Sequence, residues 1–423
     1  MNHRNAERKT GAVSFGDLVS LLAAEQVWQY EPGSPVAVKD VAGTTSQALQ
    51  TPQDFPPIES AIVQGDKVAL AVDPNLPQIC EVITGILKTF AHTEASDIDI
   101  VLWDEATDAT VASLQDVVGE SATIRRHDCT CRESLRFLGA DKDGEPIYLS
   151  RWLVDADFVL PVVSARPWDA QDRQDLTGVF PTLADSATRI RHRNKMLDAN
   201  ETESRMDESQ VAWLLGVHLI LTVHVTADGA SGQIVAGSLN KIRALNAPQP
   251  RTDENASLII ASLDGDAQQQ TWLNAARALA AASHHVLPGG AIVLWSDIND
   301  HPTGDLAQLA DVDDINSVIS CMSTEASDEP DGFPNWDDSL SVASTIARIT
   351  AEHRVLIHSQ LDRETVEPIG LGAVADRDEL IRLSKSFDTC GVLRGAQFAS
   401  GTIDAPHYTM ATNEETTTGD VAK

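Results

Sequence analysis

The sequence predicts an α/β fold with two α/β domains, each built on a mainly parallel sheet, and a cleft between them. Its 423 residues and 42% hydrophobic content exceed what a single core of about 250 to 300 residues holds. Short apolar runs also alternate with amphipathic helical segments, first over residues 67–103 and again over residues 258–296. Strand–helix–strand units of this kind form parallel sheets with right-handed crossovers.

The first unit runs from the apolar segment 67–72 to a second apolar segment, 98–103. Between them, apolar residues recur at the spacing of one helix face: Ile79, Val82, Ile83, Ile86, Leu87 and Phe90. A third apolar run, 157–163, predicts a central buried strand that leads into a polar loop. Ligands of open α/β sheets gather at the carboxyl ends of strands, so we expect the ligand site in this loop, including the segment 166–168 and the turn at residues 177–178.

A hairpin is predicted near the end of the first domain. Residues 217–225 alternate between apolar and polar side chains, and residues 233–236 supply the return strand. His218 and His224 fall on the less apolar face of this hairpin, where we expect them to be solvated. Ahead of this domain, residues 15–28 predict an amphipathic helix.

The polar stretch 247–255 marks the predicted domain boundary, because the strand and helix pattern restarts after it. We expect residues 1–54 to be a lead-in, 55–250 the first domain, 251–400 the second domain and 401–423 a disordered tail. The elements expected in the second domain are strand 258–261, helix 267–286, strand 291–296, helix 339–353, strand 355–358, helix 376–387 and strand 392–398.

Charge and hydropathy limit the partners of this chain. Its 31 basic and 63 acidic residues give a formal net charge of -32, which argues against binding nucleic acid or an anionic membrane surface. No apolar run reaches the ~18 residues of a membrane-spanning helix, and the N-terminus lacks a signal-peptide pattern. We therefore expect a cytoplasmic protein whose partner is a small-molecule ligand in the cleft between the domains.

Five scattered cysteines do not make a disulfide framework in a chain of this length, so reduced thiols are expected. The densest group of metal-ligand types is the segment 127–131, which reads His-Asp-Cys-Thr-Cys. Side chains two positions apart in a loop do not by themselves make a tetrahedral site, and no second pair is spaced to complete one. We interpret this segment as a loop or strand end.

Several short segments follow one another in the order seen in a known family: Gly65-Asp66-Lys67-Val68-Ala69, Arg126-His127-Asp128, Ser134-Leu135-Arg136-Phe137-Leu138-Gly139, Gly144-Glu145-Pro146-Ile147-Tyr148-Leu149, Asp155-Ala156-Asp157-Phe158-Val159 and Pro288-Gly289-Gly290-Ala291-Ile292-Val293-Leu294. Over residues 55–398 the chain resembles a divergent member of the nickel-dependent lactate racemase family. The resemblance implies a two-domain α/β fold and a racemase of 2-hydroxy acids that uses a pincer-type nickel nucleotide.

At the positions that the resemblance makes catalytic, this sequence departs from the family pattern. The family's Asp-x-Thr-Arg-Pro loop reads Asp73-Pro74-Asn75-Leu76-Pro77, so Leu76 stands where an arginine would help to hold substrate and cofactor. The Thr-Gly-Thr-His loop corresponds to residues 104–108, where Thr107 lies and no histidine remains. The second acid/base histidine is replaced by Trp168.

The elements that would hold the cofactor also differ. The family's Ser-Gly-Gly-x-Lys run, whose lysine binds the cofactor covalently, reads Thr177-Gly178-Val179-Phe180-Pro181, and no lysine lies between Lys142 and Lys195. His192 lies near the family's nickel-binding histidine and is the metal-ligand candidate. The Gly-Gly-Tyr-Pro-Lys loop is replaced at residues 263–266, which include Asp264. We expect no cofactor, and the pincer nickel nucleotide in particular to be absent.

Two function classes remain. The first is a repurposed binding scaffold or inactive homologue, a pseudoenzyme, whose ligand would contact Asp73, Leu76, Arg166, Trp168, Thr177, Gly178 and Asp264. We expect Leu76, Thr107, Trp168 and Asp264 to line the cleft.

The second class is an enzyme with altered chemistry, such as a racemase-like or epimerase-like isomerase of a small hydroxy acid that could depend on a metal. It would use a new carboxylate-rich pocket for a divalent cation or a cationic substrate: Asp73, Asp104, Glu105, Asp108, Arg166 and Asp169. A solvated loop rim is the competing interpretation of these carboxylates. Ordinary lactate racemisation ranks below both classes.

Overall fold

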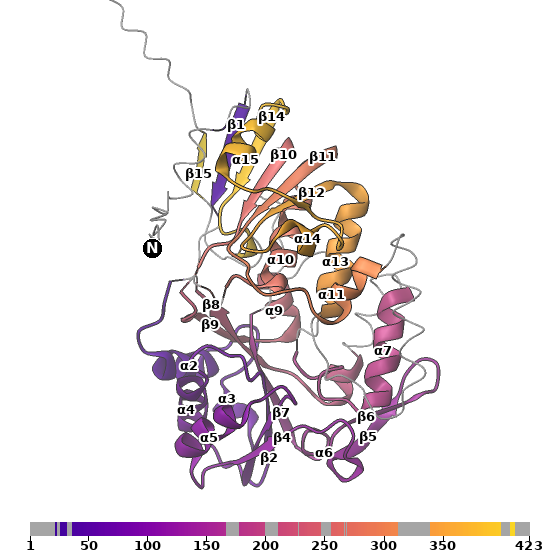
Figure 1. Ribbon diagram of the computed structural model, residues 1–423. Helices are drawn as coiled ribbons and strands as arrows, with labels where there is room; N and C mark the ends of the chain where they lie inside the picture. Colours follow the sequence, from indigo (N-terminus) through magenta and orange to yellow (C-terminus); the bar gives the residue numbers. More distant parts are fainter. Residues whose placement is uncertain are drawn as a thin grey trace, which may run out of the picture.

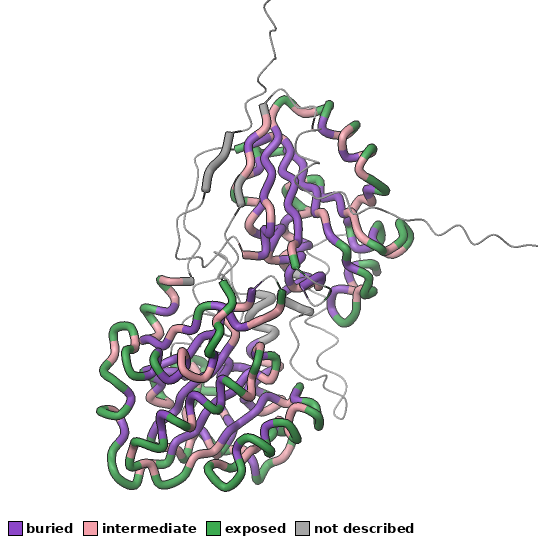
Figure 2. Tube along the Cα trace, turned by 90° about the vertical axis from the view of Figure 1, so that its left-hand side faces the viewer, coloured by how far each residue is buried: buried purple, intermediate pink, exposed green. Residues whose placement is uncertain are grey.

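The computed structural model describes residues 22, 26–31, 36–165, 177–198, 210–226, 228–246, 255–265, 267, 269–311, 339–398 and 407–410. Two large sheets organise this part of the chain, and they lie in separate halves of the molecule (Figure 1). Buried residues concentrate in the strands of both halves, while exposed residues follow the outer helices and turns (Figure 2). The predicted α/β class with mainly parallel sheets is confirmed.

The first sheet has six strands in the order β4-β3-β2-β7-β8-β9. Their bounds are β2 Lys67–Val72, β3 Asp97–Leu102, β4 Thr123–Arg126, β7 Phe158–Ser164, β8 Ile220–Val225 and β9 Ser231–Gly237. Neighbouring strands are parallel except for β8 and β9, which form the predicted antiparallel hairpin. Strand β7 pairs with β2 on one side and β8 on the other, which confirms its central position.

One face of this sheet is covered by four helices: α2 Val41–Gln50, α3 Ile58–Ala61, α4 Ile79–Phe90 and α5 Asp108–Val118 (Figure 1). In helix α4, the side chains of Val82, Ile83 and Ile86 pack in a core shared with β2 and β3. Helices α2 and α4 approach so closely that a Cβ on Gly85 would lie 2.4 Å from the Ala42 carbonyl oxygen. Packing thus fixes the amphipathic face that the sequence predicts.

A second core lies on the other face of the first sheet, where Ala69, Val101 and Val159 meet apolar residues of the loop 177–184. The elements on this side are the 3-10 helix Arg132–Ser134, β5 Leu135–Ala140, β6 Pro146–Ser150, α6 Arg151–Val154, α7 Ser186–Asp198 and α9 Leu239–Asn246. Strands β5 and β6 form a separate two-stranded antiparallel sheet. Both faces of the main sheet are therefore buried.

The second sheet has seven strands in the order β13-β12-β11-β10-β14-β1-β15. Their bounds are β1 Gln26–Glu31, β10 Ala256–Ser262, β11 Val286–Trp295, β12 Arg354–His358, β13 Gly372–Ala373, β14 Thr389–Leu393 and β15 His407–Met410. Only β15 runs antiparallel to its neighbour among these described strands.

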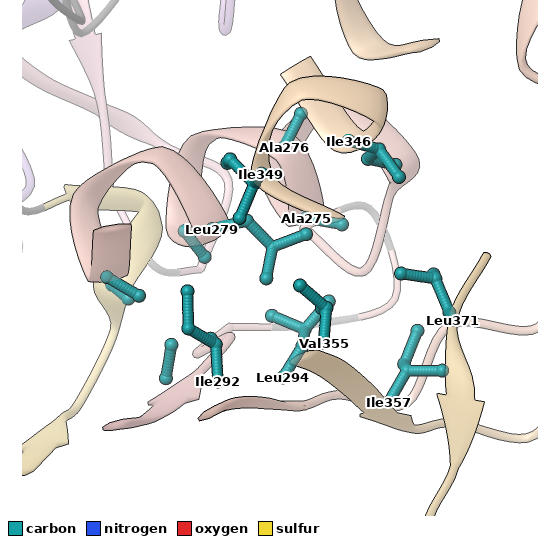
Figure 3. Close-up of a cluster of buried hydrophobic side chains, with 14 of the residues drawn as sticks. Ala275, Ala276, Leu279, Ile292, Leu294, Ile346, Ile349, Val355, Ile357 and Leu371 are labelled. Atoms are coloured by element: carbon teal, nitrogen blue, oxygen red, sulfur yellow. The ribbon is translucent and has the colours of Figure 1, made fainter. Parts of the chain in front are cut away.

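The helices of this half are α10 Trp272–Ser283, α11 Gly304–Gln308, α13 Ser339–Glu352, α14 Arg363–Val366 and α15 Arg377–Ser384, with 3-10 turns at Leu309–Asp311 and Ala396–Phe398. Figure 3 shows the core between two of these helices and the sheet. Its residues come from α10, α13, β11 and β12: Ala275, Ala276, Leu279, Ile346, Ile349, Ile292, Leu294, Val355 and Ile357. The small alanines let α10 lie close to the strands.

Five predictions need correction. Residues 396–398 of the predicted strand 392–398 form a 3-10 helix, and strand β14 ends at Leu393. The predicted helix 267–286 is shorter, because α10 ends at Ser283 and Val286 begins strand β11. Residues 26–28 lie in strand β1 and not at the end of a helix, because they pair with β14 across the second sheet. Residues 407–410, within the segment predicted to be disordered, form β15 against β1. His224 is buried and only 9% exposed, because the face of β8 that was expected to be open is also covered. The predicted boundary 247–255 lies outside the described residues except for Asn255.

Candidate functional site

The candidate site is at the carboxyl edge of the first sheet, the side on which the parallel strands β2, β3, β4 and β7 end. Of the residues predicted there, Arg166, Trp168 and Asp169 lie outside the described part of the chain. Asp73 follows β2 and is 2% exposed. Its carboxylate accepts hydrogen bonds from the backbone N–H of Asn75 at 2.8 Å and from the backbone N–H of Ser164 at 3.4 Å. Asp73 thus ties the end of β2 to the end of β7.

Leu76 lies in the hydrophobic core and is 5% exposed. It belongs to the cluster that contains Val82 and Ala106, on the face of the sheet covered by α4 and α5. The side chain that replaces the implied arginine therefore packs inward from the loop after β2. A guanidinium at this depth would have to be desolvated.

The loop 177–184 crosses the carboxyl edge, and every one of its residues is buried. The Trp103 indole Nε1–H donates to the Gly178 carbonyl at 2.9 Å. Gly178 has a φ of +66°, and a Cβ there would lie 2.6 Å from Val163 Cγ1 and 2.7 Å from Trp103 Cζ2. Thr177 Oγ1 accepts a hydrogen bond from the Val179 amide at 3.2 Å. Both the positive φ and the close approach require glycine at residue 178.

An ion pair holds this loop to the sheet. Asp104 Oδ2 lies 2.6 Å from Arg189 Nη1, and the two side chains are 9% and 5% exposed. Asp104 follows β3, and Arg189 lies on α7, which begins just after the loop. The other Arg189 terminal nitrogen donates to the Thr182 carbonyl. Sequence reasoning missed Arg189, because nothing local indicates that a helix far along the chain reaches the end of β3.

Two histidines flank the same loop. His127 follows β4, and its Nε2 lies 3.0 Å from the Ala184 carbonyl, which can only accept, so this nitrogen carries the proton. Burial, followed by the charge of Arg189, lowers the pKa of His127 to about 4. His192 on α7 is 5% exposed, and its ring meets Phe180 edge-on with centroids 5.0 Å apart. The metal-ligand candidate is thus packed against the loop.

The segment 127–131 forms a loop, as predicted. Asp128 Oδ1 accepts from the Thr130 amide at 2.9 Å, the Thr130 hydroxyl at 2.7 Å and the Cys131 amide at 3.1 Å. Hydrogen bonds from Thr130 lower the pKa of Asp128, while burial raises the pKa of Cys129. Within the described ranges, no three His, Cys, Asp or Glu side chains gather closely enough to hold a metal ion.

The remaining carboxylates of the predicted acidic pocket have separate partners. Asp108 is 94% exposed at its side chain and pairs with Arg126 at 2.9 Å. Glu105 accepts from the Asn75 side chain at 3.3 Å. Thr107 is exposed and caps α5 by accepting from the Thr110 amide at 3.1 Å. The carboxylates at the end of β3 therefore point to different surroundings.

A second carboxyl edge lies on the other sheet, where Asp264 follows β10. The side-chain amide of Gln397 binds the backbone of Asp264 twice. Its Nε2 donates to the Asp264 carbonyl at 2.6 Å, and its Oε1 accepts from the Asp264 backbone N–H at 3.3 Å. In the neighbouring strands, Trp295 and His358 stack with ring centroids 3.9 Å apart. Sequence reasoning did not find this pair, although each residue is the polar or aromatic end of an apolar run.

Residues 17–164 match the family model of the lactate racemase N-terminal domain. This N-terminal part of the chain is therefore similar to the lactate racemase family. No curated protein matches the sequence significantly. Among solved structures, the lactate racemase apoprotein from Thermoanaerobacterium thermosaccharolyticum is similar with a TM-score of 0.68 and 15% identity, covering 90% of this chain and 94% of that one.

A protein from Thermotoga maritima is also similar, with a TM-score of 0.51 and 11% identity, covering 82% of this chain and 93% of that one. These likenesses extend the shared fold over most of this chain's length. None of the helices in the described ranges combines the length and apolarity that a membrane span requires.

Proposed function

We propose that this chain is a member of the lactate racemase family that serves as a binding scaffold and does not catalyse nickel-dependent racemisation. The observation that carries the proposal is the buried Asp104–Arg189 ion pair. The resemblance aligns the first acid/base histidine loop with residues 104–108, and Asp104 from this segment is instead committed to holding the loop 177–184. The segment that would carry an acid/base histidine thus serves in packing, and Thr107, at the implied catalytic position, caps α5.

The residues present do not fit the pincer nickel nucleotide. Covalent attachment needs an amine, and residues 177–185 contain no lysine. The loop is buried along residues 177–184, and its Gly178 carbonyl is occupied by Trp103. Leu76, at the place of the implied substrate-holding arginine, lies in the core. Accordingly, no reaction step is assigned to this cofactor.

The ligand that we propose is a small molecule bound between the two carboxyl edges, over the surface that covers the buried residues Asp73, Thr177 and Gly178 on one side and near Asp264 on the other. A formal net charge of -32 disfavours polyanionic ligands by long-range repulsion. The alternative of an isomerase with an acidic metal pocket has less support, because Asp104 and Asp108 pair with different arginines.

The test is co-expression of the full chain with the enzymes that make the nickel nucleotide. We expect the intact mass to equal that of the bare polypeptide, nickel to be substoichiometric, and lactate enantiomers not to interconvert. The lactate racemase from Thermoanaerobacterium thermosaccharolyticum, loaded in the same cells, is the positive control. A covalent nucleotide adduct with stoichiometric nickel and lactate exchange would overturn the proposal.

A further inference from the structure

Buried polar atoms without a hydrogen-bond partner collect beside the loop 177–184. Within the described part of the chain, they include Ser150 Oγ, whose backbone amide donates to the Leu183 carbonyl, and three atoms on linked side chains: Asp104 Oδ1, His127 Nδ1 and Arg189 Nε. Native proteins pair nearly all buried polar atoms, either with protein groups or with ordered water. Three such atoms in one region therefore indicate a place where a further hydrogen-bonding molecule belongs.

The three side chains converge on the same part of the fold. Asp104 and Arg189 are in direct contact at 2.6 Å. Arg189 and His127 bind carbonyls only two residues apart in the loop, those of Thr182 and Ala184. The His127 backbone amide also donates to the Leu102 carbonyl at 2.9 Å, which places it beside the end of β3, two residues before Asp104.

The hydrogen-bonding role of each free atom is fixed by its other contacts. Asp104 Oδ1 is a carboxylate oxygen and accepts. His127 donates through Nε2 to Ala184, so Nδ1 of the neutral ring is an acceptor. Arg189 Nε carries a hydrogen and can only donate. The region thus offers two acceptors and one donor, and the charges of Asp104 and Arg189 cancel.

We infer that Asp104, His127 and Arg189 together bind one water molecule. Water donates two hydrogen bonds and accepts from a third group, which matches the set. Ammonium has no lone pair for the Arg189 N–H, and an alcohol has only one hydrogen for two acceptors. The water joins the ends of β3 and β4 to α7. It makes these three residues positioning residues for the loop that carries Thr177 and Gly178.

A crystal structure of the full chain at a resolution that orders internal waters tests the inference directly. We expect one water within hydrogen-bond distance of Asp104 Oδ1, His127 Nδ1 and Arg189 Nε, and a nitrogen NMR signature of the Nε2–H tautomer for His127. Direct hydrogen bonds among Asp104 Oδ1, His127 Nδ1 and Arg189 Nε, an ion with anomalous signal in their place, or the Nδ1–H tautomer would overturn it. Neither readout involves nickel or ligand, so the outcome is independent of the proposed function.

A variant pair measures the positioning role. His127→Phe keeps a ring of similar size but removes both nitrogens, so amide hydrogen exchange in residues 179–185 should accelerate at least about ten-fold. His218→Phe alters an exposed histidine and should leave those amides unchanged. Equal exchange in the two variants would contradict the positioning role. If His127→Phe fails to fold, the crystal structure and tautomer of the unaltered protein still decide the inference.

Discussion

Replacing Arg189 by methionine should destabilise the first half of the molecule strongly. The substitution removes the partner of Asp104, whose side chain is 9% exposed, and the hydrogen bond to the Thr182 carbonyl. Removing one partner of a buried ion pair costs about 3 to 5 kcal/mol, because the other charge stays buried without compensation. A loss of this size lowers the melting temperature of a domain of this length by roughly 10 °C.

The matched control is Asp108→Asn, which breaks an ion pair with nearly the same geometry in a different environment. Asp108 lies 2.9 Å from Arg126, but the two side chains are 94% and 47% exposed. Exposed pairs contribute about 0 to 1 kcal/mol, so this variant should melt close to the unaltered protein.

Thermal unfolding followed by calorimetry gives both values, and adding Asp104→Asn to Arg189→Met should restore part of the loss. Equal melting temperatures for Arg189→Met and Asp108→Asn would refute the assignment of Asp104 and Arg189 as the contact that holds the loop.

Three further predictions concern glycine, histidine and leucine positions. Gly178→Ala should lower the free energy of unfolding, measured by urea titration, by about 3 kcal/mol, because of the positive φ and the overlap with Val163 and Trp103. Gly65→Ala, which also has a positive φ but open space around it, should lower it by about 1 kcal/mol. Burial lowers the pKa of His224 from 6.5 to about 4. As the pH falls, the unfolded chain therefore binds a proton on this residue before the folded chain does. The resulting contribution to the free energy of unfolding, roughly 3 kcal/mol, is fully present above pH 6.5 and is lost as the pH falls towards 4. His224→Gln should make the free energy of unfolding, measured by denaturation at several pH values, less dependent on pH. Leu76→Arg should abolish or severely reduce the yield of folded protein, because it buries a charge. Leu76→Met should lower the free energy of unfolding by less than about 1.5 kcal/mol. A stable Leu76→Arg protein would show that residue 76 lies at the surface.

Local patterns in the sequence were sufficient to predict the elements whose partners are near in the chain. Helix α4 and strand β7 follow from helical spacing and from an apolar run of strand length, and both are where they were expected. Strand β1 could not be found in this way, because its partner β14 lies more than 350 residues later and residues 26–28 fall at the end of the amphipathic pattern over residues 15–28. Pairing at such separation is decided by the completed sheet.

In the candidate site too, features set by local sequence could be predicted, and features set by distant packing could not. The position of Asp73 at the end of β2 follows from the strand and the turn after it. The partnership of Asp104 with Arg189 spans 85 residues and depends on how α7 packs, which no spacing rule provides. The burial of His224 was likewise missed, because alternation along β8 suggests a face open to water, while tertiary packing covers both faces.

The pairing of β1 with β15 has a consequence for re-engineering the chain. Glu31 is paired with His407 and Trp28 with Met410, so segments near the two ends of the polypeptide lie side by side in one sheet. A short flexible linker that replaces the segments outside these two strands could therefore join Met410 to Gln26, and new ends could be opened in the β-turn at residues 142–144 between β5 and β6, where Gly144 has open space around it. Such a circular permutant would keep every strand pairing of the parent while moving the chain ends to the opposite half of the molecule.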